Sequence, residues 1–100
     1  MSDIPVTWDP RKARQNVEKH RVSFEEASTV FYDENALQID DPDEASGEDR
    51  FVMIGLSARL RLLAVCHCVR GAKNEIRIIS ARRAVKAEQN QYWERQRLGR

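Results

Sequence analysis

The sequence predicts an α+β domain in which two N-terminal helices and one C-terminal helix pack on a small antiparallel β-sheet. The main observation is that three apolar, β-branched runs, residues 51–56, 62–69 and 75–81, follow one another with about five residues between them, a spacing typical of antiparallel hairpins. Helix start signals precede these runs, and a helical pattern follows them. One hundred residues are too few for two domains, so we expect residues 1–100 to fold as a single domain.

The chain begins with a short strand that leads into a helix. Residues 4–8 are β-branched and aromatic, with a proline near their start, which favours an edge strand. Asp9 is suited to the N-cap of a helix, and Pro10 to the first helical position, where its missing N–H costs nothing. We therefore expect a first helix that starts here and stops near His20.

Both N-terminal helices are expected to be amphipathic. In the first, Ala13, Val17 and His20 share one face at spacings of four and three. The second starts with a capping box, in which the Ser23 hydroxyl accepts from the Glu26 N–H while the Glu26 carboxylate bonds back to the backbone. This second helix should end before residue 33.

The remaining elements flank the three hairpin strands. Residues 36–40 form a short strand candidate, and residues 41–49 form an acidic polar loop. After the sheet, Val85, Tyr92 and Trp93 mark a last helix. The hairpin strands and this helix complete the expected fold.

Composition excludes several protein classes. The chain is 41% hydrophobic with only 4 Gly and 3 Pro, so it is neither low-complexity nor collagen-like. No stretch approaches the roughly 18 apolar residues of a membrane-spanning helix, and residues 1–9 lack the pattern of a signal peptide. The two cysteines are too few and too close for a disulfide framework. We therefore expect a soluble, cytoplasmic protein.

Charge is segregated along the chain, although the net charge is only +1. Residues 22–49 carry ten acidic residues and no Lys or Arg, whereas residues 50–100 carry twelve Lys or Arg against three acidic residues. Because arginine pairs with phosphate through a planar two-point fork, an arginine-rich surface suggests nucleic-acid binding. The alternative is that the acidic and basic segments neutralise each other across the fold.

Four arginines stand near expected strand ends, where they could grip phosphates or form an ordinary solvated rim. They are Arg59, Arg61, Arg82 and Arg83. Tyr92 or Trp93 could stack on a base, or pack against the sheet instead. Glu88 shares a helix side with Tyr92, and we expect it to pair with one of the two arginines that end the last strand.

The central hairpin carries the sharpest geometric expectation. If Val69 and Glu75 close the loop, His67 lies opposite Arg77, and opposed side chains are roughly 4.5 to 5.5 Å apart at Cβ. Histidine moves protons near neutral pH, and arginine stabilises charge that grows on phosphate oxygens. The alternative is that His67 packs within the sheet while Arg77 pairs with an acidic residue.

A metal site at Cys66, His67 and Cys68 is disfavoured, although all three side chains are of zinc-ligand types. Alternation along a strand sends both thiols to one face and the imidazole to the other, so the three cannot converge on one ion. We expect buried thiols and no metal.

The ordered motifs of the chain resemble those of the BrnT family of bacterial type II toxins, over about residues 8–92. The motifs include Trp8-Asp9-Pro10, Lys19-His20, the segment 22–27, Gly47-Glu48, the segment 54–57, His67, Arg70-Gly71, the segment 77–82, Glu88 and Tyr92. Two positions where this family commonly has glycine hold Arg21 and Leu60 instead, so these residues either take positive φ at a modest cost or re-form the local loops.

The resemblance implies a RelE-like endoribonuclease that needs no metal or other cofactor and promotes attack of a ribose 2′-hydroxyl on the adjacent phosphate. It implies the catalytic candidates His67, Arg77 and Arg82, with His20 as a possible second proton-transfer group. It implies the RNA-positioning candidates Lys19, Arg59, Arg83 and Tyr92. The partner implied is a BrnA antitoxin, whose DNA-binding domain would be the only link to operator DNA.

Two other functions stay open at this point. The chain could be a non-catalytic RNA-binding or protein-interaction module, or a toxin copy that has lost activity. The acidic stretch Asp40 to Asp49 has no assigned chemistry, and we hypothesise that it docks a basic antitoxin segment or shields the basic site.

Overall fold

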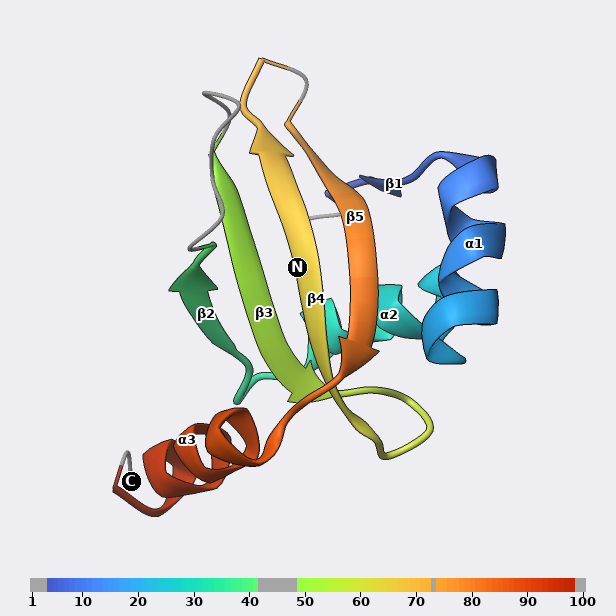
Figure 1. The fold of residues 1–100 in the computed structure, drawn as a ribbon. Coiled ribbons are helices and arrows are strands. Elements are labelled where there is room, and N and C mark those ends of the chain that lie inside the picture. Colours follow the sequence, from blue (N-terminus) through green and yellow to red (C-terminus); the bar gives the residue numbers. More distant parts are fainter. Residues whose placement is uncertain (1–3, 42–48, 73, 99–100) are drawn as a thin grey trace.

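The computed structural model describes residues 4–41, 49–72 and 74–98 (Figure 1). The strands are β1 (Val6–Thr7), β2 (Leu37–Asp40), β3 (Arg50–Leu56), β4 (Leu62–Arg70) and β5 (Glu75–Arg83). The helices are α1 (Pro10–His20), α2 (Phe24–Ser28), the 3₁₀ helix η1 (Thr29–Tyr32) and α3 (Lys86–Leu98). The strands form one sheet in the order β1-β5-β4-β3-β2. The predicted α+β fold is confirmed, and β1 is an edge strand as expected, but it runs parallel to β5, so the sheet is mixed.

Helix α1 begins and ends where the sequence predicts. The Asp9 side chain accepts from the Arg11 N–H at 2.9 Å and Pro10 occupies the first turn, which confirms the predicted start. The helix ends at His20 because Arg21 adopts the left-handed conformation at φ 59° and donates its N–H to the Val17 carbonyl. Arg21 therefore takes a positive φ at the position where glycine was expected.

Helix α2 has half of the predicted capping box. Ser23 Oγ accepts from the Glu26 N–H at 3.0 Å as expected. The Glu26 carboxylate does not bond back to the backbone, because it accepts from Ser57 Oγ at 2.7 Å and from Arg61 Nε at 2.9 Å. This buried carboxylate therefore fixes the turn between β3 and β4 to α2.

Each face of the sheet has its own hydrophobic core. One core includes Phe24, Leu63 and Val65 and is covered by α1, α2 and η1. In Figure 1, α2 passes behind the strands and α1 stands beside the edge of β5. The other includes Ile54 and Tyr92 and lies under α3, at the foot of the sheet. The upper part of this second face in Figure 1, toward the turn between β4 and β5, is not covered by a helix, and we call it the open face.

Asn16 ties α1 to the edge of β5. Strand β1 pairs only with Ile76 and Arg77, so the edge of β5 beyond them needs other partners. The Asn16 Nδ2 donates to the carbonyls of Val22 and Ala81, at 2.9 and 2.8 Å, and its Oδ1 accepts from the Ala81 N–H at 3.1 Å. Asn16 is buried and Ala13 packs against the core, but Val17 is 41% exposed, so only Val17 is wrong in the expected apolar face of α1.

Most of the acidic loop, residues 42–48, lies outside the described residues, and with it the proposed docking function of Asp43 and Glu44. Asp41 is buried and lies 3.2 Å from Arg50. Among the described residues, none of the helices is both long and apolar enough to cross a membrane.

Candidate active site on the open face of the sheet

The register of β4 and β5 differs from the expected one at two places, the turn and a bulge in β5. Arg70 pairs with Glu75, Cys68 with Arg77 and His67 with Ile78, but Cys66 pairs with Ser80, so Ile79 is an extra residue. The turn is also shorter than expected, because Asn74 at φ 51° donates its N–H to the Gly71 carbonyl and closes it tightly. The expected pairing of His67 with Arg77 is therefore wrong.

The bulge places Arg77 and Arg82 on the same face of the sheet. Five positions separate these residues, so a regular strand would send their side chains to opposite faces. On the regular strand β4, Cys68 and Ala64 share a face, and they pair with Arg77 and Arg82 respectively. Both arginines therefore project onto the open-face side of the sheet.

Three strands contribute one row of side chains across this face. Arg50 on β3 and Arg77 on β5 flank Cys68 on β4, so their Cα atoms are roughly 10 Å apart at the usual strand spacing. This row lines a pocket of about 310 Å³ together with Arg70 and Lys12. Among the described residues, the Nε atoms of Arg50 and Arg70 are buried without a hydrogen-bond partner.

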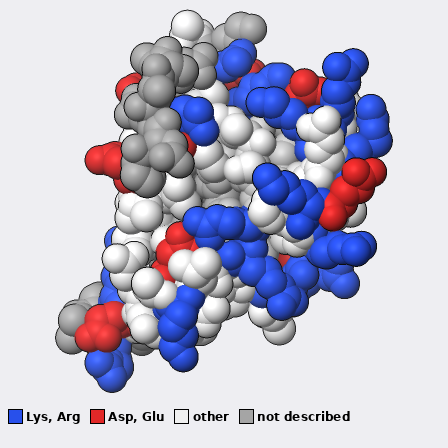
Figure 2. Space-filling view, in the orientation of Figure 1, with Lys and Arg blue, Asp and Glu red and all other residues white. Residues whose placement is uncertain are grey.

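A second pocket continues the first along β5. It measures about 230 Å³ and is lined by Lys19 and His20 from the last turn of α1, by Ser80, and by Lys12 and Ile79, which also line the first pocket. We call the two together the basic groove. Figure 2 shows Lys and Arg side chains gathered over this side of the molecule, with few acidic side chains among them.

The two histidines have opposite environments. His67 is 1% exposed, with its ring against Phe31 and Phe51 at centroid distances of 4.9 and 6.0 Å. Its Nδ1 lies 3.1 Å from the Val65 carbonyl oxygen, and burial lowers its pKa. His67 therefore packs within the sheet, as the alternative had it, because its position on β4 faces η1, and the catalytic candidate His67 lies outside the basic groove. His20 lies half-buried in the wall of the basic groove.

The two cysteines lie on the face opposite His67, as the alternation predicts. Cys66 Sγ is 3.2 Å from an Asp41 carboxylate oxygen and 3.4 Å from Arg50 Nη2. Burial and the neighbouring Asp41 carboxylate raise the Cys66 pKa, and the Arg50 contact only partly offsets them. Among the described residues, no three His, Cys, Asp or Glu side chains come together as a metal site.

Arg82 forms the two-point ion pair with Glu88 that the sequence predicts as one of two options. The distances are 2.8 Å from Nη1 to Oε1 and 2.9 Å from Nη2 to Oε2. Glu88 Oε1 also accepts from the Val85 N–H, so it caps the start of α3. The Arg82 guanidinium lowers the pKa of Glu88. The ion pair between Arg82 and Glu88 therefore links β5 to α3 beside the basic groove.

Three expected RNA-positioning residues lie away from the groove. Tyr92 is 1% exposed and donates its hydroxyl to Asp33 Oδ2 at 2.6 Å, so its expected stacking on a base is wrong. It instead anchors α3 to the sheet. Arg59 and Arg83 are exposed at the other end of the sheet, on the β3–β4 turn and at the end of β5.

The structure therefore brings together only part of the expected site. Lys19, His20 and Arg77 line the basic groove. Sequence reasoning missed Lys12, Arg50 and Arg70. Lys12 and Lys19 are seven positions apart, which places them on one helix face, and this spacing is the signal that could have found Lys12. Arg50 and Arg70 join the site through the strand register alone.

Comparison with known proteins agrees with this architecture. The crystal structure of the Brucella abortus ribonuclease toxin BrnT, at 1.1 Å resolution, superposes with a TM-score of 0.64 at 22% sequence identity, covering 83% of this chain and 99% of the Brucella chain. At this identity the likeness concerns the fold. No curated protein sequence matches the chain. The family profile described as "Ribonuclease toxin, BrnT, of type II toxin-antitoxin system" matches residues 8–88. Because this match spans most of the sequence, the chain belongs to the BrnT family of type II ribonuclease toxins.

Proposed function

We propose that this protein cleaves RNA in the basic groove, with His20 as the proton-transfer group and Arg77 and Lys19 as phosphate-stabilising cations. Membership of a ribonuclease toxin family supports the reaction class. The observation that carries the site is the lining of the groove. It holds the half-buried imidazole of His20 together with five cations, Lys12, Lys19, Arg50, Arg70 and Arg77, and one carboxylate, Asp9, which caps α1.

In the proposed reaction, neutral His20 takes the proton of a ribose 2′-hydroxyl. The 2′ oxygen forms a bond to the adjacent phosphorus, and the bond from phosphorus to the 5′ oxygen breaks. The departing 5′ oxygen takes a proton from the ammonium group of Lys12, which lines both pockets of the groove. Arg77 stabilises the charge that grows on the non-bridging oxygens. The products are a 2′,3′-cyclic phosphate and a 5′-hydroxyl.

Protein groups would supply every proton and charge in this sequence, so we propose RelE-like, metal-independent chemistry. Arg82 lies two residues beyond Ser80 on the same side of the sheet. We assign it to positioning RNA through the part of its positive charge that the ion pair with Glu88 leaves uncompensated. We assign Arg59 and Arg83 no direct role in cleavage.

Cleavage of end-labelled RNA by purified protein tests the proposal. His20→Ala should lower the rate by about 100-fold or more, and Arg77→Ala by a similar factor, because each removes one proton-transfer or charge-stabilising group. Arg14→Ala is the matched control, since it removes one exposed charge from α1 outside the groove. Excess EDTA should leave the rate unchanged, and the products should carry cyclic phosphate ends.

Other results would reject the proposal. RNA that is bound at low salt but never cut would favour a non-catalytic binding module, whose affinity should fall with salt at a slope of roughly −0.7 per phosphate contacted. An active His20→Ala variant would remove the assignment of the proton-transfer group while leaving the family unchanged.

We also propose that the cognate antitoxin is BrnA-like and carries the DNA-binding domain of the system. Type II membership supports a protein antitoxin. In gel-shift assays on the operator of the pair, the antitoxin and the toxin–antitoxin complex should bind DNA, and the toxin alone should not. Specific operator binding by the toxin alone would contradict this assignment.

A further inference from the structure

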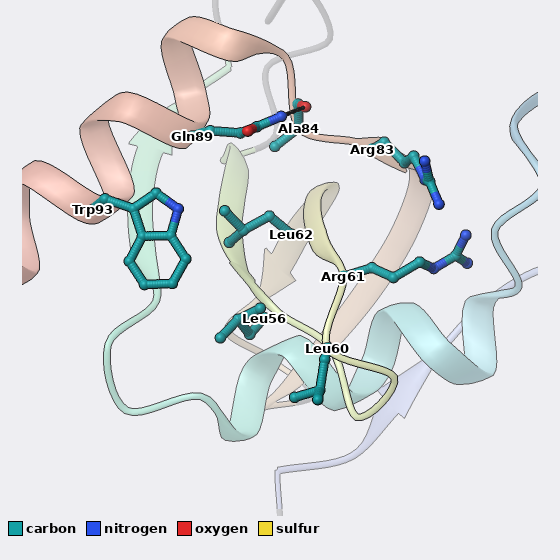
Figure 3. Close-up of a pocket in the computed structure, with 8 residues that line it drawn as sticks. All are labelled: Leu56, Leu60, Arg61, Leu62, Arg83, Ala84, Gln89 and Trp93. Carbon is teal, nitrogen blue, oxygen red and sulfur yellow. Dashed lines mark hydrogen bonds between the residues drawn. The ribbon is translucent and has the colours of Figure 1, made fainter.

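A pocket of about 320 Å³ lies at the end of the sheet remote from the turn between β4 and β5, outside the basic groove. Leu56 and Leu62, the paired residues that end β3 and begin β4, form its apolar floor. Figure 3 shows Trp93 of α3 on one side, Leu60 of the β3–β4 turn below, and the Arg61 side chain extending on the side away from Trp93. We call this the terminal pocket.

Leu60 is presented to solvent by a strained and rigid turn. It is 79% exposed and has φ 63°, a conformation that costs a branched residue roughly 1 kcal/mol or more. Its N–H donates to the Ser57 carbonyl at 2.9 Å, and Ser57 donates its hydroxyl to buried Glu26 at 2.7 Å. Arg61 binds the same carboxylate. The turn is thus fixed by buried polar bonds, yet it displays an apolar side chain at its tip.

Trp93 is the second exposed apolar group and is also well supported. It is 49% exposed, and its ring meets the edge of Tyr92 at a centroid distance of 4.9 Å. Tyr92 is in turn anchored on Asp33. Rigid aromatic and aliphatic anchors bind at a low entropic cost, which is typical of protein-binding surfaces.

The charge around the terminal pocket is positive. Its described lining contains no carboxylate, and Arg83 lies on its rim. Arg59 stands next to Leu60 in the turn, and in the described part of the chain neither Arg59 nor Arg83 forms a salt bridge. An occupant must therefore combine apolar side chains with acidic ones. The leucine floor fits an aliphatic side chain, which favours a protein segment over a nucleobase.

We propose that the terminal pocket binds an acidic, amphipathic segment of the cognate antitoxin. An aliphatic or aromatic side chain of this segment inserts between Leu60 and Trp93, and flanking Asp or Glu side chains pair with Arg59 and Arg83. The proposal rests on family membership for the existence of an antitoxin, and it holds whether or not the assignment of His20 is correct.

Titration of the toxin with its cognate antitoxin, by calorimetry, tests the proposal. Leu60→Gly is the central variant because glycine is favoured at φ 63°, so the turn keeps its conformation while the anchor is lost. We expect Leu60→Gly and Trp93→Ala each to weaken binding at least tenfold, and Arg83→Glu to weaken it further at low salt. Tyr32→Ala is the matched control, since Tyr32 is 71% exposed at a different pocket.

The RNA cleavage assay separates this proposal from the preceding one. Leu60→Gly should cut RNA at the wild-type rate and escape antitoxin inhibition. If Leu60→Gly and Trp93→Ala bind the antitoxin normally, the proposal is overturned. If these variants also lose RNA cleavage while their antitoxin affinity is unchanged, the pocket is a base-binding subsite instead. An inactive wild-type protein with reduced antitoxin binding in Leu60→Gly would reject the catalytic proposal and support this one.

Discussion

Replacing Asn16 with alanine tests the clamp between α1 and β5, which positions Lys12, Lys19 and His20 against the sheet. The change removes three hydrogen bonds of 2.8 to 3.1 Å and leaves the buried N–H of Ala81 without its side-chain acceptor. Each bond contributes about 1 kcal/mol net, and an unpaired buried group costs a further 1 to 3 kcal/mol or so. The free energy of unfolding should therefore fall by roughly 4 to 6 kcal/mol.

Urea unfolding followed by circular dichroism measures this loss. Gln15→Ala, at the exposed neighbouring position, should change the free energy of unfolding by less than about 0.5 kcal/mol. A loss below about 1 kcal/mol in Asn16→Ala would refute the reasoning.

Asn16→Asp gives a second, pH-dependent check. Its carboxylate would face the carbonyl oxygens of Val22 and Ala81, which raises its pKa above the unfolded value of about 3.9. A raised folded pKa means that the deficit relative to the wild type is largest at neutral pH and shrinks as the carboxyl is protonated. A deficit that is constant between pH 7 and pH 4 would contradict the geometry.

Three further predictions concern stability. Burial lowers the pKa of His67, so wild-type stability should fall as pH drops below about 6.5, by at most about 1.4 kcal/mol per pH unit for this group, and His67→Leu should lose that component in urea titrations at pH 7.5 and 5. Gly55→Ala should lower the free energy of unfolding by roughly 1 to 3 kcal/mol in a thermal melt, because its Cβ would lie 3.0 Å from both Ala36 Cβ and Val30 Cγ1. Arg21→Gly should raise the free energy of unfolding by up to about 1 kcal/mol, since φ is 59° there, and a clear loss in urea would show that the arginine side chain stabilises the fold.

Local signals predicted most of the fold. The N-caps Asp9 and Ser23 accept from N–H groups two or three residues away, so both helix starts can be predicted from neighbouring residues in the sequence. The apolar runs of β3, β4 and β5 were likewise visible as short patterns. The partner of Glu26 could not be predicted, because Arg61 and Ser57 reach it only through the packing of the β3–β4 turn on α2.

The candidate site depends on long-range register, which explains the errors there. Nothing in the alternation of residues 75–83 marks Ile79 as a bulge, and one extra residue changes every pairing beyond it. His67 lies on the turn side of this bulge, so it was placed opposite the wrong residue because the turn is one residue shorter than expected. The spacing of Tyr92 in its helix is compatible with either a buried or an exposed side chain. Its hydrogen bond to Asp33, which is distant in the sequence, accompanies the burial and could not be predicted from the spacing.

The bulge at Ile79 ties the site to the length of β5 as well as to its composition. Arg77 and Arg82 share a face only because this extra residue offsets their odd spacing of five positions. Deleting Ile79 would leave a spacing of four, which puts both arginines on one face of a regular strand, whereas a deletion between them that kept the bulge would turn them toward opposite sides. Alignments should therefore be judged at this position by spacing before residue identity.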